Sequence, residues 1–100
     1  MDKRSENWFK SWTEKFCVLT NVGLLYYDDP YKRPKNLFPT IDCQIKPIAE
    51  GKYNRKYVFL LKSFNYEIIF AARQKEEYER WIKAFARLQV ETEKKKKDII

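Results

Sequence analysis

Apolar residues recur every three or four positions between Gln74 and Val90. They are Tyr78, Trp81, Ile82, Phe85 and Leu88. This spacing places them on one side of an α-helix of about four or five turns. Glutamates crowd the first turns, whereas Lys83 and Arg87 come later, an order that suits the helix dipole. We therefore predict an amphipathic helix from about Gln74, whose aromatic side, Trp81 included, is buried in the core.

The chain before this helix consists mainly of short runs that are typical of β-strands. We predict strands over Trp12–Thr20, Gly23–Asp28, Leu37–Ile41, Cys43–Ile48, Lys56–Lys62 and Tyr66–Ala71. The first two form a hairpin, because Asn21-Val22-Gly23 between them is a turn signal. Residues 1–12 show no long alternating run and predict a loop. Together these elements predict a mostly β fold with one helix, of the α+β class: a bent antiparallel barrel or sandwich, capped at one end by the C-terminal helix.

The first predicted strand carries a lysine on the side that faces the core. Alternation places Lys15 in one row with Cys17 and Leu19. Phe16 and Val18 belong to the opposite side. A cation in an apolar row is unusual unless it lies at the open end of the sheet, where it can meet a ligand. Lys15 is therefore a candidate ligand-binding residue.

Length and composition indicate one domain with a substantial core. The chain has 100 residues, of which 44% are hydrophobic and 17% aromatic. We assign residues 1–92 to the domain and residues 93–100 to a charged tail, which is expected to fray or to extend the helix. Cys17 and Cys43 lie in apolar runs and are expected to be buried free thiols, which suits a reducing compartment. No apolar run approaches the ~20 residues that cross a bilayer, and no signal peptide is visible, so we expect a cytoplasmic location.

The charge balance favours an anionic partner. Lysine and arginine number 21 against 14 aspartates and glutamates, which gives a net charge of +7. Phosphoinositide headgroups, an acidic peptide and nucleic acid are the candidates, and a basic surface that only maintains solubility is the alternative. The basic and aromatic residues do not interleave along one strand face, as they do in a stacking platform for bases. We therefore expect no nucleic-acid partner.

Catalytic motifs are not visible in the sequence. The chain has no histidine, and its serines lie in no nucleophile motif. Gly23 and Gly51 are the two glycines, so no glycine-rich phosphate loop exists. Two cysteines without histidine argue against a structural zinc site. We expect a non-catalytic protein that needs no cofactor and no metal.

Two separated motifs resemble the pleckstrin-homology (PH) domain. WTEKFCVLTNVGLLYYDD, residues 12–29, is similar to the second and third strands of that family. Phe70 and Ala72, a glutamate-rich stretch and then Trp81-Ile82-x-Ala84 are similar to its end. The segment 34–40 resembles its fourth-strand region. The resemblance covers roughly residues 3 to 90 and implies the PH fold.

The sequence departs from the family pattern in two places. Only Met1 and Asp2 precede Lys3-Arg4, so most of the family's first strand is missing or truncated, which would leave a sheet edge unpaired. Either the sequence is cut there, or another segment supplies the strand, or the strand is very short. Thr13 occupies a position where the better lipid binders of the family often have a basic residue.

The resemblance also implies a phosphoinositide site. The positions that match the family's basic pattern, or that lie in the loops beside it, are Lys3, Lys10, Lys15, Tyr26, Lys32, Arg33 and Lys35. Neighbouring phosphates need converging cations and hydroxyl donors. Because this set is rich in lysine, we expect modest affinity and loose choice among isomers. The loop cations can also be merely solvated, and Tyr26 can be a packing residue.

The function implied by the resemblance is a non-catalytic module. It would bind inositol phospholipids or inositol phosphates and recruit its parent protein to an anionic membrane surface, as a cytoplasmic, peripheral protein. The alternative is a PH-fold module that binds a protein partner and has weak or no lipid affinity, because the fold alone does not determine the function.

Overall fold

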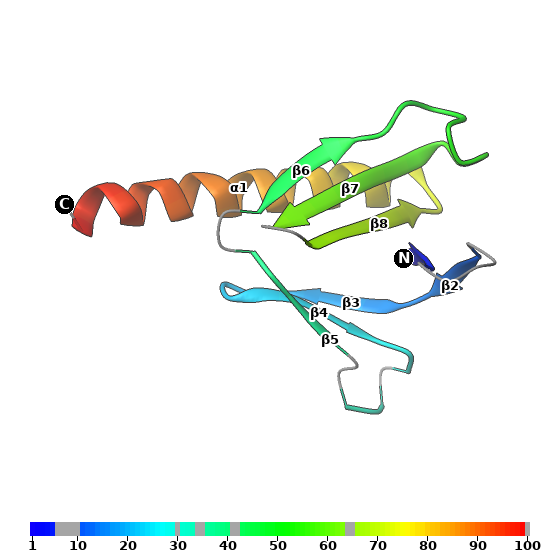
Figure 1. The fold of residues 1–100 in the computed structure, drawn as a ribbon, viewed down its shortest axis with the longest axis horizontal. Helices are drawn as coiled ribbons and strands as arrows, with labels where there is room; N and C mark the ends of the chain where they lie inside the picture. The colour runs from blue at the N-terminus through cyan, green and yellow to red at the C-terminus, as the bar shows by residue number, and fades with distance from the viewer. Residues whose placement is uncertain (6–10, 30, 34–35, 41–42, 64–65, 100) are drawn as a thin grey trace.

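The computed structural model contains two antiparallel sheets and one long C-terminal helix (Figure 1). It describes residues 1–5, 11–29, 31–33, 36–40, 43–63 and 66–99, with side chains as far as Gln89. The elements are β1 (Asp2–Arg4), β2 (Trp12–Glu14), β3 (Phe16–Leu19), β4 (Gly23–Tyr27), β5 (Asn36–Pro39), β6 (Gln44–Pro47), β7 (Tyr57–Ser63), β8 (Tyr66–Ala72) and α1 (Lys75–Ile99). The expected mostly β fold with one helix is confirmed.

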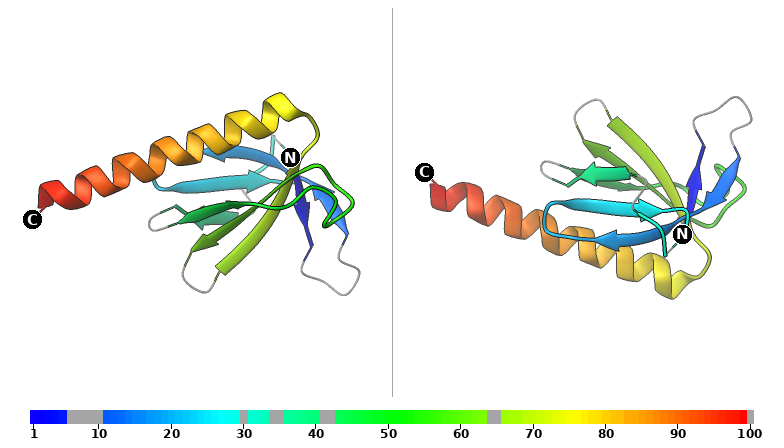
Figure 2. Two further views of the ribbon diagram at one scale, coloured as in Figure 1. Left: turned by 90° about the horizontal axis from the view of Figure 1, so that it is seen from above. Right: turned by 90° about the horizontal axis from the view of Figure 1, so that it is seen from below.

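The two sheets form a sandwich and do not close into a barrel. One sheet has the strand order β2-β1-β8-β7-β6, and the other has the order β3-β4-β5. The helix α1 runs along one side of the sandwich and contacts β6, β7 and β8 (Figure 2). The Gln89 side chain fixes it there by donating a hydrogen bond of 2.7 Å to the Cys43 carbonyl oxygen.

The N-terminal segment contains a strand, so the predicted loop over residues 1–12 is wrong for its first part. Asp2–Arg4 forms β1, in which Lys3 pairs with Thr13 of β2 on one side and with Phe70 of β8 on the other. The strand that the family pattern led us to expect is present in this chain and is three residues long. Asp2 and Lys3 pair with Ala71 and Phe70 and so cover the edge of β8 that would otherwise be open there.

The predicted strand over Trp12–Thr20 is two strands that belong to different sheets. β2 pairs with β1 in the five-stranded sheet, and β3 pairs with β4 in the three-stranded sheet. Lys15 is the residue between them. Its amide donates to the Met1 carbonyl at 2.7 Å, and its carbonyl accepts from the Met1 nitrogen at 2.8 Å. The chain therefore crosses from one sheet to the other at Lys15, whose backbone stays hydrogen-bonded to Met1, the residue before β1.

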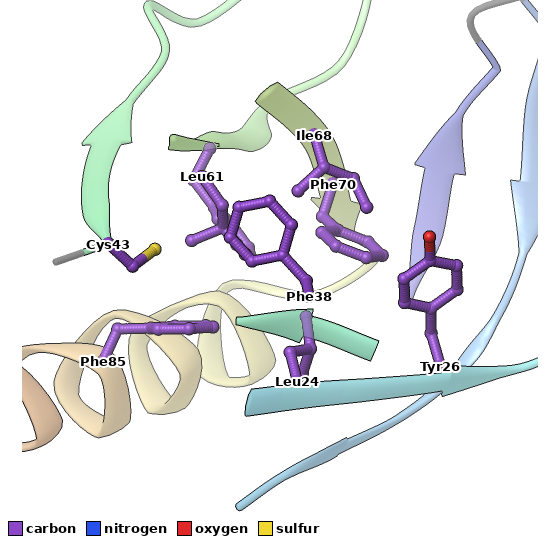
Figure 3. Close-up of a cluster of buried hydrophobic side chains, with 9 residues drawn as sticks. Leu24, Tyr26, Phe38, Cys43, Leu61, Ile68, Phe70 and Phe85 are labelled. Atoms are coloured by element: carbon purple, nitrogen blue, oxygen red, sulfur yellow. The ribbon is translucent and has the colours of Figure 1, made fainter. Parts of the chain in front are cut away.

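The core lies between the two sheets and is closed by α1. Leu24 and Phe38 point into it from the three-stranded sheet, opposite Leu61 and Phe70, and Phe85 enters from α1 (Figure 3). The Phe85 ring lies 6.2 Å from the Phe59 ring, centroid to centroid. Aromatic rings at this separation attract each other in addition to burying area.

The sequence predicted that Trp81 is buried in the core, and this is correct only in part, because Trp81 packs against the core but stays partly exposed. Phe85 is 2% exposed, whereas Trp81 is only partly buried and packs on the Phe85 ring at 6.2 Å. The helix also continues past Val90, through the lysine run to Ile99. The division between a domain and a charged tail at residue 92 stays a prediction. No helix in the described part of the chain is both long enough and apolar enough to span a membrane.

The outer surface of the three-stranded sheet is unusually apolar. Phe16, Val18 and Leu37 are 41%, 49% and 49% exposed there. Phe16 is paired with Tyr27, and Val18 and Leu37 both flank Leu25, so these side chains share one face. This sheet is therefore apolar on both sides, a pattern usual in sheets that are covered on both faces.

Candidate functional site

A polar cavity of about 310 Å³ lies where the paired strands β1 and β2 meet β4 and β5. It is lined by Lys3, Ser5, Thr13, Lys15, Tyr26, Asp28 and Asn36. A neighbouring cavity of about 430 Å³ shares Lys3, Tyr26 and Asn36, and its other lining residues include Leu37, Phe38 and Ile68. The smaller cavity is the better candidate for an anion, because two lysines converge on it with hydroxyl and amide groups.

Lys15 is the most buried cation of this cavity. The residue is 8% exposed, and its ammonium group forms an ion pair with the Asp28 carboxylate. A buried ammonium group is costly without such a partner. Sequence alternation had placed Lys15 on the core-facing side, and the structure confirms that placement. The change of sheet at Lys15 then brings the ammonium group to the corner where the cavity opens.

The turn of the β3–β4 hairpin places Asp28 opposite Lys15. The Thr20 amide donates to the Gly23 carbonyl at 2.9 Å, and the Gly23 amide donates to the Thr20 hydroxyl oxygen at 3.1 Å. The connection is therefore two residues long, and Phe16 faces Tyr27. The next positions outward along the hairpin are Lys15 and Asp28.

Lys3 and Tyr26 form the inner wall of the cavity. The Lys3 ammonium nitrogen lies 5.8 Å from the centroid of the Tyr26 ring, within the range of a cation–π contact. Tyr26 is 8% exposed and stands edge-on to the Phe70 ring, so it is a core residue as well as a lining residue. In Figure 3 its hydroxyl group points away from β4 toward β1.

The predicted site residues divide into three groups. The structure brings Lys3, Lys15 and Tyr26 together around one cavity. Lys32 and Arg33 are exposed on the β4–β5 loop and do not line it. Lys10 and Lys35 lie outside the described residues. A ligand role for all seven stays a prediction.

Four lining residues were missing from the predicted site. Ser5 directly follows β1, and Thr13 belongs to β2. Asp28 directly follows β4, and Asn36 is the first residue of β5. Register is the signal that could have found the last two. Asn36 is the direct partner of Tyr26 in the β4–β5 ladder, as Asp28 is the neighbour of Lys15 across the hairpin.

A cluster of arginines holds β1, and with it Lys3, in place. Asp2 accepts hydrogen bonds from Arg55 at 2.9 Å and from Arg73 at 3.1 Å. Burial acts to raise the pKa of the Asp2 carboxyl, but the hydrogen bonds and charges of the two guanidinium groups outweigh it, so the pKa is lowered. The Arg4 guanidinium also stacks 4.4 Å from the Tyr53 ring centroid. The short strand is thus fixed by its side chains as well as by its two ladders.

Both cysteines are free thiols in partly or fully buried positions. Burial raises the pKa of Cys17 to about 11, with smaller opposing effects of nearby charges, and burial raises the pKa of Cys43 to about 11. A thiol with such a pKa carries little thiolate near neutral pH and is a poor nucleophile.

Comparison with known proteins agrees with this fold. The model of the PH domain family matches residues 2–90. Pleckstrin homology domain-containing protein 1 of Arabidopsis thaliana is 28% identical over 87 residues, which cover 81% of this chain and 60% of that protein. Pleckstrin homology-like domain family A member 2 of Xenopus tropicalis is 34% identical over 76 residues, which cover 75% of this chain and 56% of that protein. The chain thus spans less than two thirds of either relative.

Solved structures show the same arrangement of sheets and helix. The PH domain of human pleckstrin homology domain-containing protein family A member 5 superimposes with a TM-score of 0.74 and 25% identity, over 89% of this chain and 72% of that one. The Slm1 PH domain, solved in complex with phosphoserine, superimposes with a TM-score of 0.73 and 18% identity, over 87% of this chain and 88% of that one. With the family model matched from β1 well into α1, the chain belongs to the PH domain family.

Proposed function

We propose that this domain is a non-catalytic module that binds the phosphorylated headgroup of an inositol phospholipid, or the soluble inositol phosphate, in the cavity between β1, β2, β4 and β5. The observation that carries this proposal is Lys15, a nine-tenths buried cation at the wall of a polar cavity. An ammonium group there is desolvated before a ligand arrives, so a phosphate has less water to displace from it. The phosphoserine complex of the Slm1 PH domain supports phosphate-ester binding by a related fold.

The chemistry of the lining suits a phosphorylated, hydroxylated ring. Lys3 and Lys15 supply cations, and a lysine ammonium group donates up to three hydrogen bonds. Ser5, Thr13 and Asn36 add hydroxyl and amide groups that can contact ring hydroxyls or phosphate oxygens. The cavity volume, about 310 Å³, is at the lower end of the range of small-molecule sites and suits one ring.

Recruitment to a membrane is the cellular consequence of the proposal. Lys32 and Arg33 are exposed on the β4–β5 loop, beside Tyr31, which is 96% exposed. Cations near an anionic leaflet contribute about 1 kcal/mol each, and an aromatic side chain suits the interface. With a net charge of +7, the domain would be attracted to such a surface as a cytoplasmic, peripheral protein.

Vesicle co-sedimentation at near-physiological salt tests this function. Wild-type protein is compared with Lys15→Gln, and the matched control is Lys46→Gln, which removes an exposed lysine from β6, away from the cavity. Losing a hydrogen bond to a charged group costs about 1.5–3 kcal/mol. We expect binding to phosphoinositide vesicles to fall about ten- to a hundredfold in Lys15→Gln and to stay near wild type in the control. Equal binding by both variants, abolished by salt, would reduce the effect to diffuse charge attraction.

A protein partner is the second candidate, and the apolar outer face of β3, β4 and β5 is the observation that favours it. The occupant that fits is an amphipathic helix whose apolar stripe covers Val18, Leu25 and Leu37 and whose acidic flank meets Lys32 and Arg33. A synthetic helix with glutamates beside a leucine stripe is the probe. Chemical-shift changes on the outer face, lost in Val18→Lys, support this function. Changes confined to the cavity contradict it.

A further inference from the structure

The candidate cavity contains its own anion. The Asp28 carboxylate is ion-paired with the Lys15 ammonium group, and its side chain is 50% exposed. It therefore lies at the edge of the cavity rather than beneath it, and any ligand that reaches Lys15 also meets Asp28.

We propose that Asp28 makes this cavity selective for inositol headgroups that carry one phosphate monoester and free hydroxyls, over headgroups with several phosphates. The inference rests on the proposed function, since it names the ligand class of that same site. Among the described lining residues, two lysines face one carboxylate. A single phosphate monoester carries about −1.5 to −2 charges near neutral pH, and each further phosphate adds a similar amount. Among these described residues, the two ammonium charges can balance one phosphate monoester, and the Asp28 carboxylate repels each further phosphate.

Hydrogen bonding leads to the same preference. Lys15 has three donor hydrogens, and the ion pair with Asp28 uses one direction, so the others can reach a phosphate oxygen. An ionised carboxylate only accepts hydrogen bonds, and it has about four acceptor sites. Because the Asp28 side chain is 50% exposed, a ring hydroxyl that enters the cavity can reach its carboxylate while Asp28 still holds Lys15. Where the ring carries a phosphate at that position, acceptor faces acceptor and the two negative charges repel each other.

A second carboxylate provides a matched control. Asp29 follows Asp28 directly, does not line the cavity, and accepts a hydrogen bond of 2.9 Å from the Tyr31 amide. Asp28→Asn and Asp29→Asn remove the same charge from neighbouring positions. Only Asp28→Asn removes the negative charge that lies beside Lys15. The asparagine amide oxygen in that variant can still accept a hydrogen bond from the Lys15 ammonium group. Asp28→Glu keeps the charge and serves as the conservative variant.

Isothermal titration with water-soluble dibutanoyl phosphoinositides tests the proposal. The probes are the three phosphatidylinositol monophosphates and phosphatidylinositol 3,4,5-trisphosphate. We expect wild-type protein, Asp28→Glu and Asp29→Asn to bind one monophosphate at least as tightly as the trisphosphate. Asp28→Asn should bind the trisphosphate at least tenfold more tightly than wild type, with less than a threefold gain for the monophosphate, so that the ratio of the two affinities shifts more than threefold toward the trisphosphate.

The outcomes separate this inference from the function on which it rests. If wild type binds the trisphosphate most tightly, or if Asp28→Asn and Asp29→Asn strengthen both ligands equally, the selectivity assigned to Asp28 is wrong and the headgroup function stands. If folded wild type and folded Asp28→Asn bind none of the four probes, the headgroup function fails and the inference fails with it. Thermal melting of each variant establishes that it is folded.

Discussion

Gly23→Ala should destabilise the domain, because β5 packs directly on this position. Gly23 is the first residue of β4 and pairs with Pro39. A Cβ atom built there would lie 2.5 Å from the Leu37 Cδ1 and 2.7 Å from the Phe38 carbonyl oxygen. Real Cβ atoms essentially never come within 3.0 Å of another heavy atom, so something has to move.

The contact with the Phe38 carbonyl oxygen determines how much stability Gly23→Ala loses. Leu37 is half exposed, so its side chain can rotate away from the new methyl group. The Phe38 oxygen belongs to the β5 backbone, and relieving that contact requires β4 and β5 to separate locally. Overpacking of this kind costs about 1–3 kcal/mol. The lower entropy of unfolded alanine returns about 0.4–1 kcal/mol. We therefore expect a net loss of about 1–2 kcal/mol, or a fall in Tm of roughly 5–15 °C in a domain of this size.

Thermal and urea unfolding of four proteins measure this effect: wild type, Gly23→Ala, Leu37→Ala and the double variant. If the contact with the Phe38 carbonyl oxygen dominates, Gly23→Ala lowers the free energy of unfolding by the same amount whether residue 37 is leucine or alanine. Full rescue by Leu37→Ala would show that the side chain sets the cost, and wild-type stability of Gly23→Ala would refute the packing argument altogether. Because Tyr26 and Asn36 belong to the same β4–β5 ladder, we also expect weaker headgroup binding at temperatures where the variant is folded.

Three further measurements follow from burial and charge. Phe85→Ala should cost about 3–5 kcal/mol in urea unfolding, because the ring is fully buried, whereas Trp81→Ala should cost less, because that ring keeps part of its exposure. The Asp2 pKa is lowered in the folded protein, so the stability from its arginine partners is complete above the unfolded-state pKa of about 4 and is lost as pH falls through the folded-state pKa. Asp2→Asn should lack this acid-side loss in unfolding series between neutral pH and about pH 2. Cys17 and Cys43, each with a pKa of about 11, should react slowly with iodoacetamide at neutral pH in the folded protein and at an ordinary rate in urea, as mass spectrometry would show.

Periodicity identified most elements of this fold, and register accounts for most of what it missed. The 3.6-residue period found the helix, although it could not rank Trp81 against Phe85, because both lie on the same stripe and only the facing sheet decides which ring is covered. A three-residue strand such as Asp2–Arg4 is too short to show alternation, and pairing on both sides by β2 and β8 is what makes it a strand. The break at Lys15 is likewise tertiary, since alternation continues through it.

The site shows the same limit more sharply. Lys3, Lys15 and Tyr26 could be found because each has a recognisable position in a strand, whereas Asp28 becomes part of the site only through its register against Lys15. That register depends on the length of one turn. With Asn21 and Val22 alone in the turn, Thr20 faces Gly23 and the lysine faces the acid.

A three-residue turn, with Gly23 in the loop, would shift the return strand by one position. Asp29 would then face Lys15, and the side chains of β4 would exchange their faces. Leu24 and Tyr26 would point outward, and Leu25 and Tyr27 would point into the core. Residue types would not oppose that exchange, because Leu25, Tyr27 and Asp29 would replace Leu24, Tyr26 and Asp28 with the same types of side chain. The hydrogen bonds between Thr20 and Gly23 therefore select the observed register in a strand whose residue pattern alone does not.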